Sequence, residues 1–390
     1  MKYVTIRPPR LRTIEDSEGR RHATWTELFY DLVFVVAVAA LGVRLLENTT
    51  WAGFGLFIGF FVPIWWAWAS YTFYADRFDT DDFGQRVLAV AQMITISLMA
   101  ASISGDTADS SVAFAASYVV TRVILIIMYA RARKHVPITQ RLITGYLKGF
   151  TAEVVIWGIS ILTPTPIRYW LWAIGLIVSV ATPFAMRKIQ AKVPLDVEHL
   201  PERFGLFTIL VLGESMAATV VAISHQSWSF ELIINSALAV SIAGGLWWMY
   251  FDNMEGSVVR RTGERPKAWK PTAWIYAHMP LAASLVIVAV GLEQAVAKHL
   301  DHGEFWLTSG GMAGALSFMA LISFANEKDG SRGINSQRAI RRLLGAGVVL
   351  IAGAVVQVVG SPHPTAWLIV LLIVAVAQVA SDLVLNAQAD

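Results

Sequence analysis

Two carboxylates stand at the beginning of a long apolar segment. Glu27 and Asp31 lie near the start of the stretch from Trp25 to Gly42, which is otherwise almost entirely apolar. Residues four apart project from one face of a helix, about 6 Å apart along its axis. A carboxylate within a membrane is costly unless it faces a partner or water. The two acids are therefore either a helix-start pair, favoured by the positive end of the helix dipole, or part of an ion or proton site.

A second acidic segment begins at Glu202. The sequence Glu202-x-Phe204 repeats the Glu-x-Phe pattern of the first segment and again opens an apolar run. We favour a helix-start role for Glu202, as for Glu27, and both remain candidates for a substrate- or ion-binding site. Glu214 follows about 18 Å further along the helix, near the middle of a hydrocarbon core about 30 Å thick. Glu214 is either a proton or cation site or a carboxylate neutralised by a neighbouring helix.

One arginine lies inside an apolar run. Arg122 precedes the basic Arg131 by nine residues, which places it about 13 Å deep in a helix. Its guanidinium does not lose its charge, so it demands a carboxylate or backbone carbonyls as partners. Glu214, Glu153 and Asp31 are the candidates, and the sequence does not choose among them.

A single histidine also falls within an apolar run. His278 lies about one turn into the segment 273–294, with Pro280 two residues later. A neutral imidazole relays a proton when it has a donor on one side and an acceptor on the other. A histidine in an apolar helix also serves as a satisfied hydrogen-bonding residue, and both interpretations stay open.

Aspartates gather after two of the apolar runs. The candidates for a metal site are Asp76, Asp79, Asp81 and Asp82 after the second run, and Asp252 after the eighth. Such paired clusters could hold Mg²⁺ against a diphosphate, because Mg²⁺ prefers carboxylates together with phosphate oxygens. The alternative is a solvated acidic loop tied to Arg77 and Arg86.

The composition restricts the class of protein. The 390 residues are 56% hydrophobic and 15% charged, whereas soluble domains carry about 25% charged residues. The absence of cysteine excludes disulfides and thiolate metal sites. No phosphate-binding loop, dinucleotide fingerprint, metalloprotease motif or nucleophile elbow is present. We therefore expect a membrane protein whose partner is the lipid bilayer, with no cofactor and no nucleic-acid partner.

Twelve apolar segments are long enough to cross a bilayer. The expected spans are 25–46, 53–74, 86–104, 111–130, 143–163, 168–186, 203–223, 230–251, 273–294, 305–325, 341–360 and 364–385. The fifth is the least regular, because Lys148 and Glu153 interrupt it. Lys and Arg concentrate in the even-numbered junctions, so the positive-inside rule places both termini in the cytoplasm. We expect an all-α multi-pass protein of the bacterial inner (plasma) membrane.

Short matches between the two halves predict an internal duplication. Tyr74-x-Asp76 matches Tyr250-x-Asp252, and Gln92 in Ala-Gln-Met matches His278 in Ala-His-Met. An even number of helices in each half makes the two repeats parallel. The predicted organisation is a basic cytoplasmic segment 1–24, a six-helix repeat 25–186, a cytoplasmic linker 187–201 and a second six-helix repeat 202–390.

Three motifs resemble those of the bacterial low temperature requirement A (LtrA) family. They are Glu27-Leu-Phe-Tyr-Asp31-Leu-Val-Phe34, Arg77-Phe-Asp79-Thr-Asp81-Asp82, and Glu202-Arg-Phe-Gly-Leu-Phe-Thr208 followed by Gly213-Glu214-Ser215. The resemblance extends from about Trp25 to the last apolar run. It implies a multi-helix inner-membrane protein linked to growth in the cold, and it supplies no catalytic residues.

Three functional hypotheses follow. The first is a secondary transporter of a small solute or ion, linked to protons or cations through buried carboxylates. The second is a membrane-embedded, Mg²⁺-dependent enzyme acting on lipid or isoprenoid diphosphates, which rests on the aspartate clusters. The third is a structural or lipid-sensing protein needed in the cold. We favour the transporter, and an enzymatic activity is the less favoured interpretation.

Overall fold

We analysed a computed structural model of the chain. It describes residues 7–11, 23–79, 82–103, 105, 107–190, 193, 199–224, 226–252, 269–298, 300–326, 333–360 and 363–388, without the side chains of residues 79 and 107–109. Two of the predicted site residues are affected by these gaps. Asp81 lies outside the described residues, and of Asp79 the structure describes the backbone alone.

Among the described residues, twelve helices are long and apolar enough to cross a membrane, as the sequence predicted. They are α1 (Trp25–Glu47), α2 (Trp51–Arg77), α3 (Phe83–Ile103), α4 (Thr107–His135), α5 (Gln140–Ile161), α6 (Ile167–Ala185), α8 (His199–Ser224), α9 (Phe230–Phe251), α11 (Lys270–Val296), α12 (His302–Ala325), α13 (Ile334–Val359) and α14 (Pro364–Ala387). The short helix α7 (Arg187–Gln190) follows α6, and a 3₁₀ turn (Pro137–Thr139) precedes α5.

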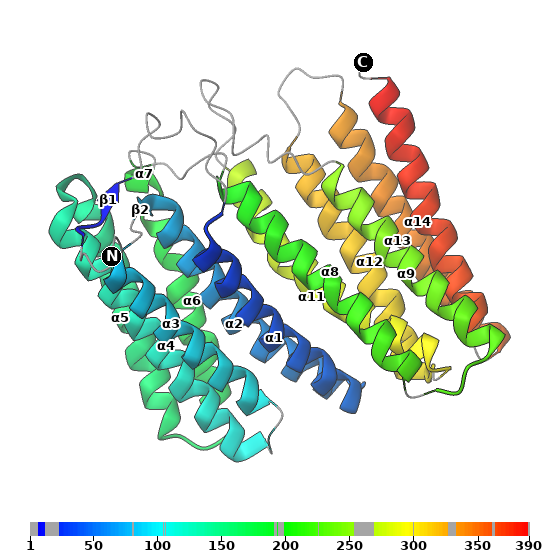
Figure 1. Ribbon diagram of the computed structural model, residues 1–390, viewed down its shortest axis with the longest axis horizontal. Coiled ribbons are helices and arrows are strands. Elements are labelled where there is room, and N and C mark those ends of the chain that lie inside the picture. Colours follow the sequence, from blue (N-terminus) through cyan, green and yellow to red (C-terminus); the bar gives the residue numbers. More distant parts are fainter. Residues whose placement is uncertain are drawn as a thin grey trace. The chain divides into compact units, whose positions relative to one another are not determined.

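The helices form two compact units. Unit 1 comprises Met1–Leu41 and Gly59–Arg203, and unit 2 comprises Gly42–Ile58 and Phe204–Asp390. Within unit 1, α3, α4, α5 and α6 pack in sequence order, each against the next (Figure 1). Within unit 2, α11, α12, α13 and α14 do the same, and α9 packs against α11 and α14. This shared packing order is the one that an internal duplication would produce, and the duplication itself stays a prediction.

The irregular fifth span forms a complete helix despite its two charged residues. Lys148 lies on the exposed side of α5, where a long side chain can extend along the apolar surface toward the membrane boundary. Glu153 is fully buried and pairs with an arginine of α4. Each charge therefore has a place that a spanning helix tolerates.

A short β-ladder accompanies the helices, which the sequence analysis did not anticipate. Strand β1 (Arg10–Leu11) pairs antiparallel with β2 (Phe78–Asp79), with Arg10 opposite Asp79 and Leu11 opposite Phe78. Strand β2 follows the last residue of α2 without a break. The N-terminal segment is thereby attached to the end of a spanning helix of unit 1.

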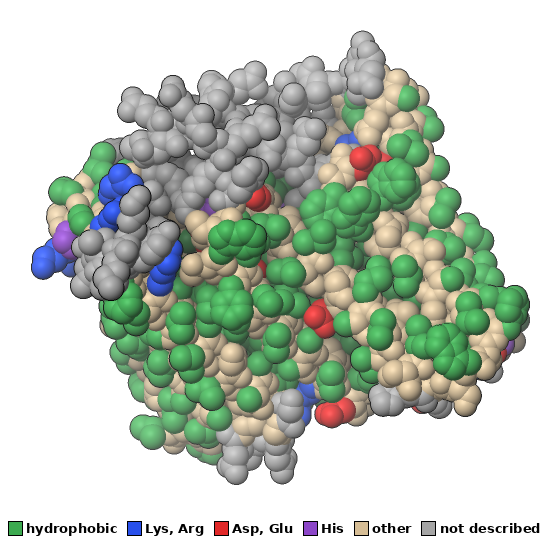
Figure 2. Space-filling model, viewed as in Figure 1, with side chains coloured by type: hydrophobic (Ala, Val, Ile, Leu, Met, Phe, Trp, Pro, Cys, Tyr) green, Lys and Arg blue, Asp and Glu red, His purple; other side chains and the backbone are tan. Residues whose placement is uncertain are grey.

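Large apolar side chains cover much of the exposed surface. Figure 2 shows hydrophobic side chains spread across the visible face. On α13 alone, Ile340, Leu344, Ile351 and Val355 are more than half exposed. Soluble monomers rarely expose contiguous apolar patches of more than a few hundred Å². Together with the twelve apolar helices, this surface identifies a polytopic membrane protein.

Candidate functional site

Charged residues from three helices of unit 1 meet in one buried group. Helix α1 contributes Glu27 and Asp31, the end of α2 contributes Asp76, and the first turn and a half of α8 contributes His199 and Arg203. All five residues are less than 5% exposed. The members from α1 and from α8 are each four residues apart, so each pair projects from one face of its helix. We call these five residues the acid–histidine cluster.

Arg203 holds the two carboxylates of α1. Its Nη2 donates to Asp31 Oδ1 at 2.6 Å, and its Nη1 lies 3.6 Å from Glu27 Oε1. Trp68 Nε1 of α2 donates to the same Asp31 oxygen at 2.8 Å. Glu27 also forms a capping box, because its carboxylate accepts the Thr24 N–H at 2.7 Å while its own N–H donates to Thr24 Oγ1 at 3.3 Å. Glu27 is thus both a helix-start acid and a member of a buried ionic group.

His199 lies between two carboxylates. Its Nδ1 is 3.2 Å from Asp76 Oδ1, and its Nε2 is 3.5 Å from Glu27 Oε1. A neutral imidazole carries one N–H, so it donates to only one of these oxygens. The second contact becomes a hydrogen bond only when the ring or a facing carboxyl holds one more proton. The geometry of His199 is that of a proton-binding group that links α1, α2 and α8.

The cluster retains unused hydrogen-bonding capacity. In the described part of the chain, Asp31 Oδ2 and the Nε and Nη1 atoms of Arg203 are buried without a hydrogen-bond partner. Thr72 Oγ1, one turn before Asp76 on the same face of α2, is in the same state. Buried polar atoms are nearly always satisfied by protein or by ordered water. Asp31 Oδ2 can therefore accept a proton or a hydrogen bond, and the Arg203 N–H groups can donate to water or to a polar solute.

A second buried network in unit 1 is centred on a carboxylate that accepts hydrogen bonds at both oxygens, and in the described part of the chain only Arg122 Nη1 of this ion pair is buried without a hydrogen-bond partner. Arg122 donates through Nη2 at 2.7 Å and through Nε at 2.9 Å to Glu153 Oε2. Ser179 donates to the same oxygen at 2.7 Å, and Tyr118 donates to Oε1 at 2.6 Å. Both carboxylate oxygens therefore accept hydrogen bonds, three at Oε2 and one at Oε1. Of the three candidate partners of Arg122, the structure gives it Glu153, as a fixed ionic anchor joining α4, α5 and α6.

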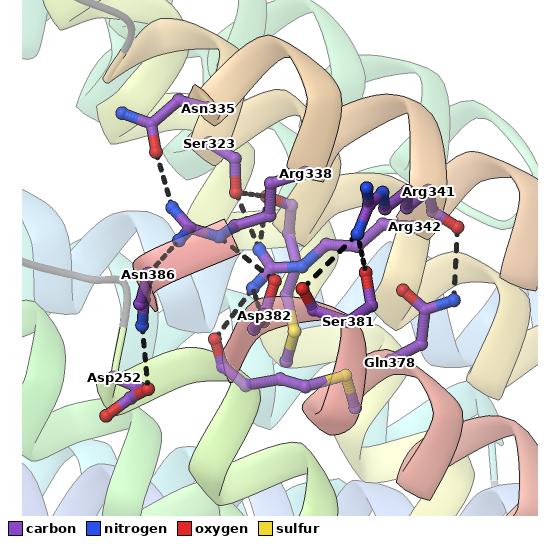
Figure 3. A network of polar contacts seen from close by, with 12 residues as sticks. Asp252, Ser323, Asn335, Arg338, Arg341, Arg342, Gln378, Ser381, Asp382 and Asn386 are labelled. Carbon is purple, nitrogen blue, oxygen red and sulfur yellow. Dashed lines mark hydrogen bonds and ion pairs between the residues drawn. The ribbon is translucent and has the colours of Figure 1, made fainter. Parts of the chain in front are cut away.

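Unit 2 contains a third charged network, which the sequence analysis missed (Figure 3). Arg338 Nε and Arg342 Nη2 of α13 bind the two oxygens of Asp382 of α14, at 3.0 and 3.1 Å. Arg342 also donates to the Met249 carbonyl of α9 at 2.8 Å and to Ser323 Oγ of α12 at 2.6 Å. These contacts lie near the C-terminal ends of α9, α12 and α14, where helix dipoles favour a cation. The network fastens four helices together.

His278 is satisfied by neutral groups. Its Nδ1 lies 2.6 Å from the Trp274 carbonyl, so this nitrogen carries the proton and donates. Its Nε2 then accepts from the Tyr250 hydroxyl at 3.2 Å. His278 touches no carboxylate in these contacts, which favours the interpretation as a satisfied hydrogen-bonding residue.

Glu214 and Glu202 lie on α8 in different settings. Glu214 is half-buried, and within unit 2 no described side chain hydrogen-bonds to its carboxylate. Glu202 Oε1 accepts the Ala23 N–H at 3.2 Å, which joins the start of α8 to the residue before the α1 cap.

Each described side chain among the predicted metal candidates has its own partner. Asp76 contacts His199, Asp82 pairs with Arg131 at 2.6 Å, and Asp252 accepts from Asn386 at 3.3 Å. Among the described residues, no group of three or more His, Asp and Glu side chains is arranged to hold a metal ion.

His199, Arg203 and Asp382 were not singled out from the sequence. His199 and Arg203 share the i, i+4 spacing of Glu27 and Asp31, and this spacing at the head of an apolar run was the available signal. Asp382 carries no local signal, because it stands alone near the end of the last apolar run.

Comparison with known proteins identifies the family. The family model described as bacterial low temperature requirement A protein (LtrA) matches residues 22–380, which include the whole acid–histidine cluster. A protein of Rhizobium meliloti (strain 1021), described as uncharacterized, is 25% identical over 333 residues, covering 78% of this chain and 77% of that relative. The family match spans nearly all of the chain, from before α1 into α14. The chain belongs to the bacterial LtrA family of membrane proteins.

Proposed function

We propose that the protein is a proton-linked secondary transporter of the inner membrane, with both termini in the cytoplasm, and that the acid–histidine cluster binds the coupling proton. The observation that carries this proposal is the unused hydrogen-bonding capacity of Asp31 and Arg203 inside spanning helices. A carboxylate oxygen without a donor is costly inside a membrane; in the described part of the chain Asp31 Oδ2 has none, whereas both oxygens of Glu153 accept hydrogen bonds.

The contrast with Arg122 supports this choice of site. In the Arg122–Glu153 pair both carboxylate oxygens accept hydrogen bonds and the arginine balances the carboxylate charge, so this carboxylate has little to gain from a proton. The acid–histidine cluster contains three carboxylates against one arginine and one histidine. It therefore carries a net charge of −2 with a neutral imidazole and −1 with a protonated one. A proton reduces an excess charge that the membrane disfavours.

The same proton changes how the helices are joined. With a second proton on the ring, His199 donates to Asp76 of α2 and to Glu27 of α1. Without it, one of these two hydrogen bonds is lost. A bound proton thus favours a state of unit 1 in which His199 links α1, α2 and α8, and its loss favours a state in which one link is broken. Coupling requires such a difference in interaction between two states.

Glu214 supplies a second carboxylate on α8. It follows Arg203 by eleven positions in the sequence. Its half-buried position without a partner in unit 2 suits a group that binds a small solute or a cation. In the proposed mechanism Glu214 binds the solute, and the acid–histidine cluster binds the proton.

The experiment compares two buried histidines in proteoliposomes that contain the pH indicator pyranine. Amino acids, sugars, polyamines and monovalent salts are added outside one class at a time. We expect one class to change the lumenal pH, because the solute moves together with protons. His199→Gln should abolish this change, since glutamine hydrogen-bonds but does not titrate. His278→Gln is the matched control and should retain it, because the ring of His278 contacts only neutral groups in its hydrogen bonds.

Two results would overturn the proposal. One is a proton-coupled response that His199→Gln leaves unchanged in a correctly folded protein. The other is the absence of any lumenal pH change with every class of solute, with wild-type protein verified as folded by size-exclusion chromatography and circular dichroism.

A further inference from the structure

The N-terminal segment is held on unit 1 by two separate devices. The first is the β1–β2 ladder, in which Arg10 and Leu11 face Asp79 and Phe78. Pro9 is buried beside the ladder, whereas Arg10 is exposed. The ladder has only two residues in each strand, and so small a pairing is marginal by itself.

The second device is centred on Asp82. Its carboxylate accepts the Arg7 N–H at 3.0 Å and pairs with Arg131 of α4 at 2.6 Å, and Arg131 also donates to the Arg7 carbonyl at 2.6 Å. Asp82 Oδ1 further accepts the Gln85 N–H at 3.0 Å, at the start of α3. One carboxylate therefore joins the N-terminal segment to α3 and α4.

Asp82 keeps its charge at neutral pH. Burial by itself raises the pKa of this carboxyl, but the hydrogen bonds from Arg131, Gln85 and Arg7 outweigh burial and hold the pKa below its usual value. A lowered pKa in the folded state stabilises the contact above the unfolded pKa, and this stabilisation is lost as the pH falls through the folded value. Small changes of pH around neutrality therefore leave the contacts of the Asp82 carboxylate intact.

The ladder lies next in the chain to the helix turn that contributes Asp76 to the proposed proton site. Asp76 is the penultimate residue of α2, and β2 begins two residues later. The pairing with β1 thus fixes the direction in which the chain leaves the last turn of α2. That turn holds Asp76 within 3.2 Å of His199. Without the pairing, the end of a helix is free to fray, as unsupported helix ends do.

We infer that residues 7–11 form an N-terminal latch that regulates the acid–histidine cluster. The latch holds the last turn of α2 in place, and this turn covers the cluster at the end of the helix. This inference rests on the proposed function for its meaning, since the latch would control the access of water and protons to His199. The latch consists of the β1–β2 ladder and the contacts of Asp82 with Arg7 and Arg131. Its strength is modest, because the ladder is short and the Arg131 side chain remains 17% exposed, so it is suited to opening.

A cysteine at position 72 can report whether water reaches the acid–histidine cluster. One face of α2 carries Trp68, Thr72 and Asp76, which are spaced four residues apart. Trp68 contacts Asp31, and Asp76 contacts His199. Thr72 is fully buried. The chain contains no cysteine, so Thr72→Cys introduces a single thiol into the row of residues that faces the cluster.

The experiment measures the rate at which a charged, water-soluble methanethiosulfonate reagent modifies Thr72→Cys in the full chain in proteoliposomes. Arg10→Pro with Leu11→Pro removes both N–H donors of β1 and should increase the rate on the order of tenfold, because local opening becomes easier. Arg10→Ala with Leu11→Ala is the matched control. It removes the same side chains, keeps the donors and should leave the rate close to that of the reporter variant alone. Asp82→Asn tests the second device and should also increase the rate.

Equal labelling rates in the proline and alanine variants would overturn the latch, as would rapid labelling with the latch intact. Labelling does not require transport, so the two proposals fail separately. Latch-dependent labelling together with His199-independent proton coupling would reject the proton site and keep the latch. If proton coupling depends on His199 but labelling does not depend on the latch, the latch is rejected and the proton site is kept.

Discussion

Replacing Glu153 by alanine is expected to destabilise the protein by about 3–5 kcal/mol, because it leaves the Arg122 guanidinium buried without its carboxylate. The pair is fully buried, with exposures of 1% for Arg122 and 0% for Glu153. The loss also removes the acceptor of the Ser179 and Tyr118 hydroxyls. Denaturant or thermal unfolding in detergent micelles, followed by circular dichroism, measures this change.

A double-mutant cycle tests the origin of the effect. Arg122→Met in the Glu153→Ala background should recover part of the stability, since it removes the orphaned charge and keeps an apolar side chain of similar length. The same Arg122→Met change combined with Glu214→Ala serves as the control and should give additive effects. If Arg122→Met instead adds its full destabilisation to that of Glu153→Ala, the two residues do not act as a pair.

Replacing Asp382 by alanine is expected to destabilise the protein at least as strongly, by about 3–5 kcal/mol or more, because two arginines lose one shared carboxylate. Among the described residues, Arg338 and Arg342 would then keep only neutral partners. The contacts that fasten α13 to α9, α12 and α14 would remain, but the charge at their centre would not. The measurement is the same unfolding transition in micelles, with proteolysis of the α13–α14 region as a local readout.

The neighbouring arginine provides a matched control for this second prediction. Arg341 lies beside Arg342 in the sequence but donates to the Ser381 hydroxyl and carbonyl instead of Asp382 (Figure 3). In the Asp382→Ala background, Arg338→Met with Arg342→Met should restore stability, whereas Arg341→Met should not. Restoration by Arg341→Met would show that net charge near the helix ends matters, and not the specific shared carboxylate.

The sequence by itself determined the class of protein and the number of its spanning helices. Both follow from the lengths of the apolar runs, because a bilayer requires about 20 apolar residues in each helix. The one-dimensional spacing also placed Glu27 and Asp31 on one face of α1, since side chains four apart align whatever the helix packs against. The helix-start role of Glu27 was readable for the same reason, as it depends on local backbone geometry.

Only the tertiary structure decided which charges meet. Arg122 had three candidate carboxylates in the sequence, and the packing of α4 against α5 brought Glu153 to it. The sequence drew attention to His278 inside an apolar run and left His199 in the predicted linker, yet His199 faces two carboxylates and His278 faces a carbonyl and a hydroxyl. His199 lies 123 positions from Asp76, and Arg203 lies 172 positions from Asp31. Periodicity describes the face of a single helix, whereas the partner across the interface depends on how whole helices pack, which no local spacing encodes.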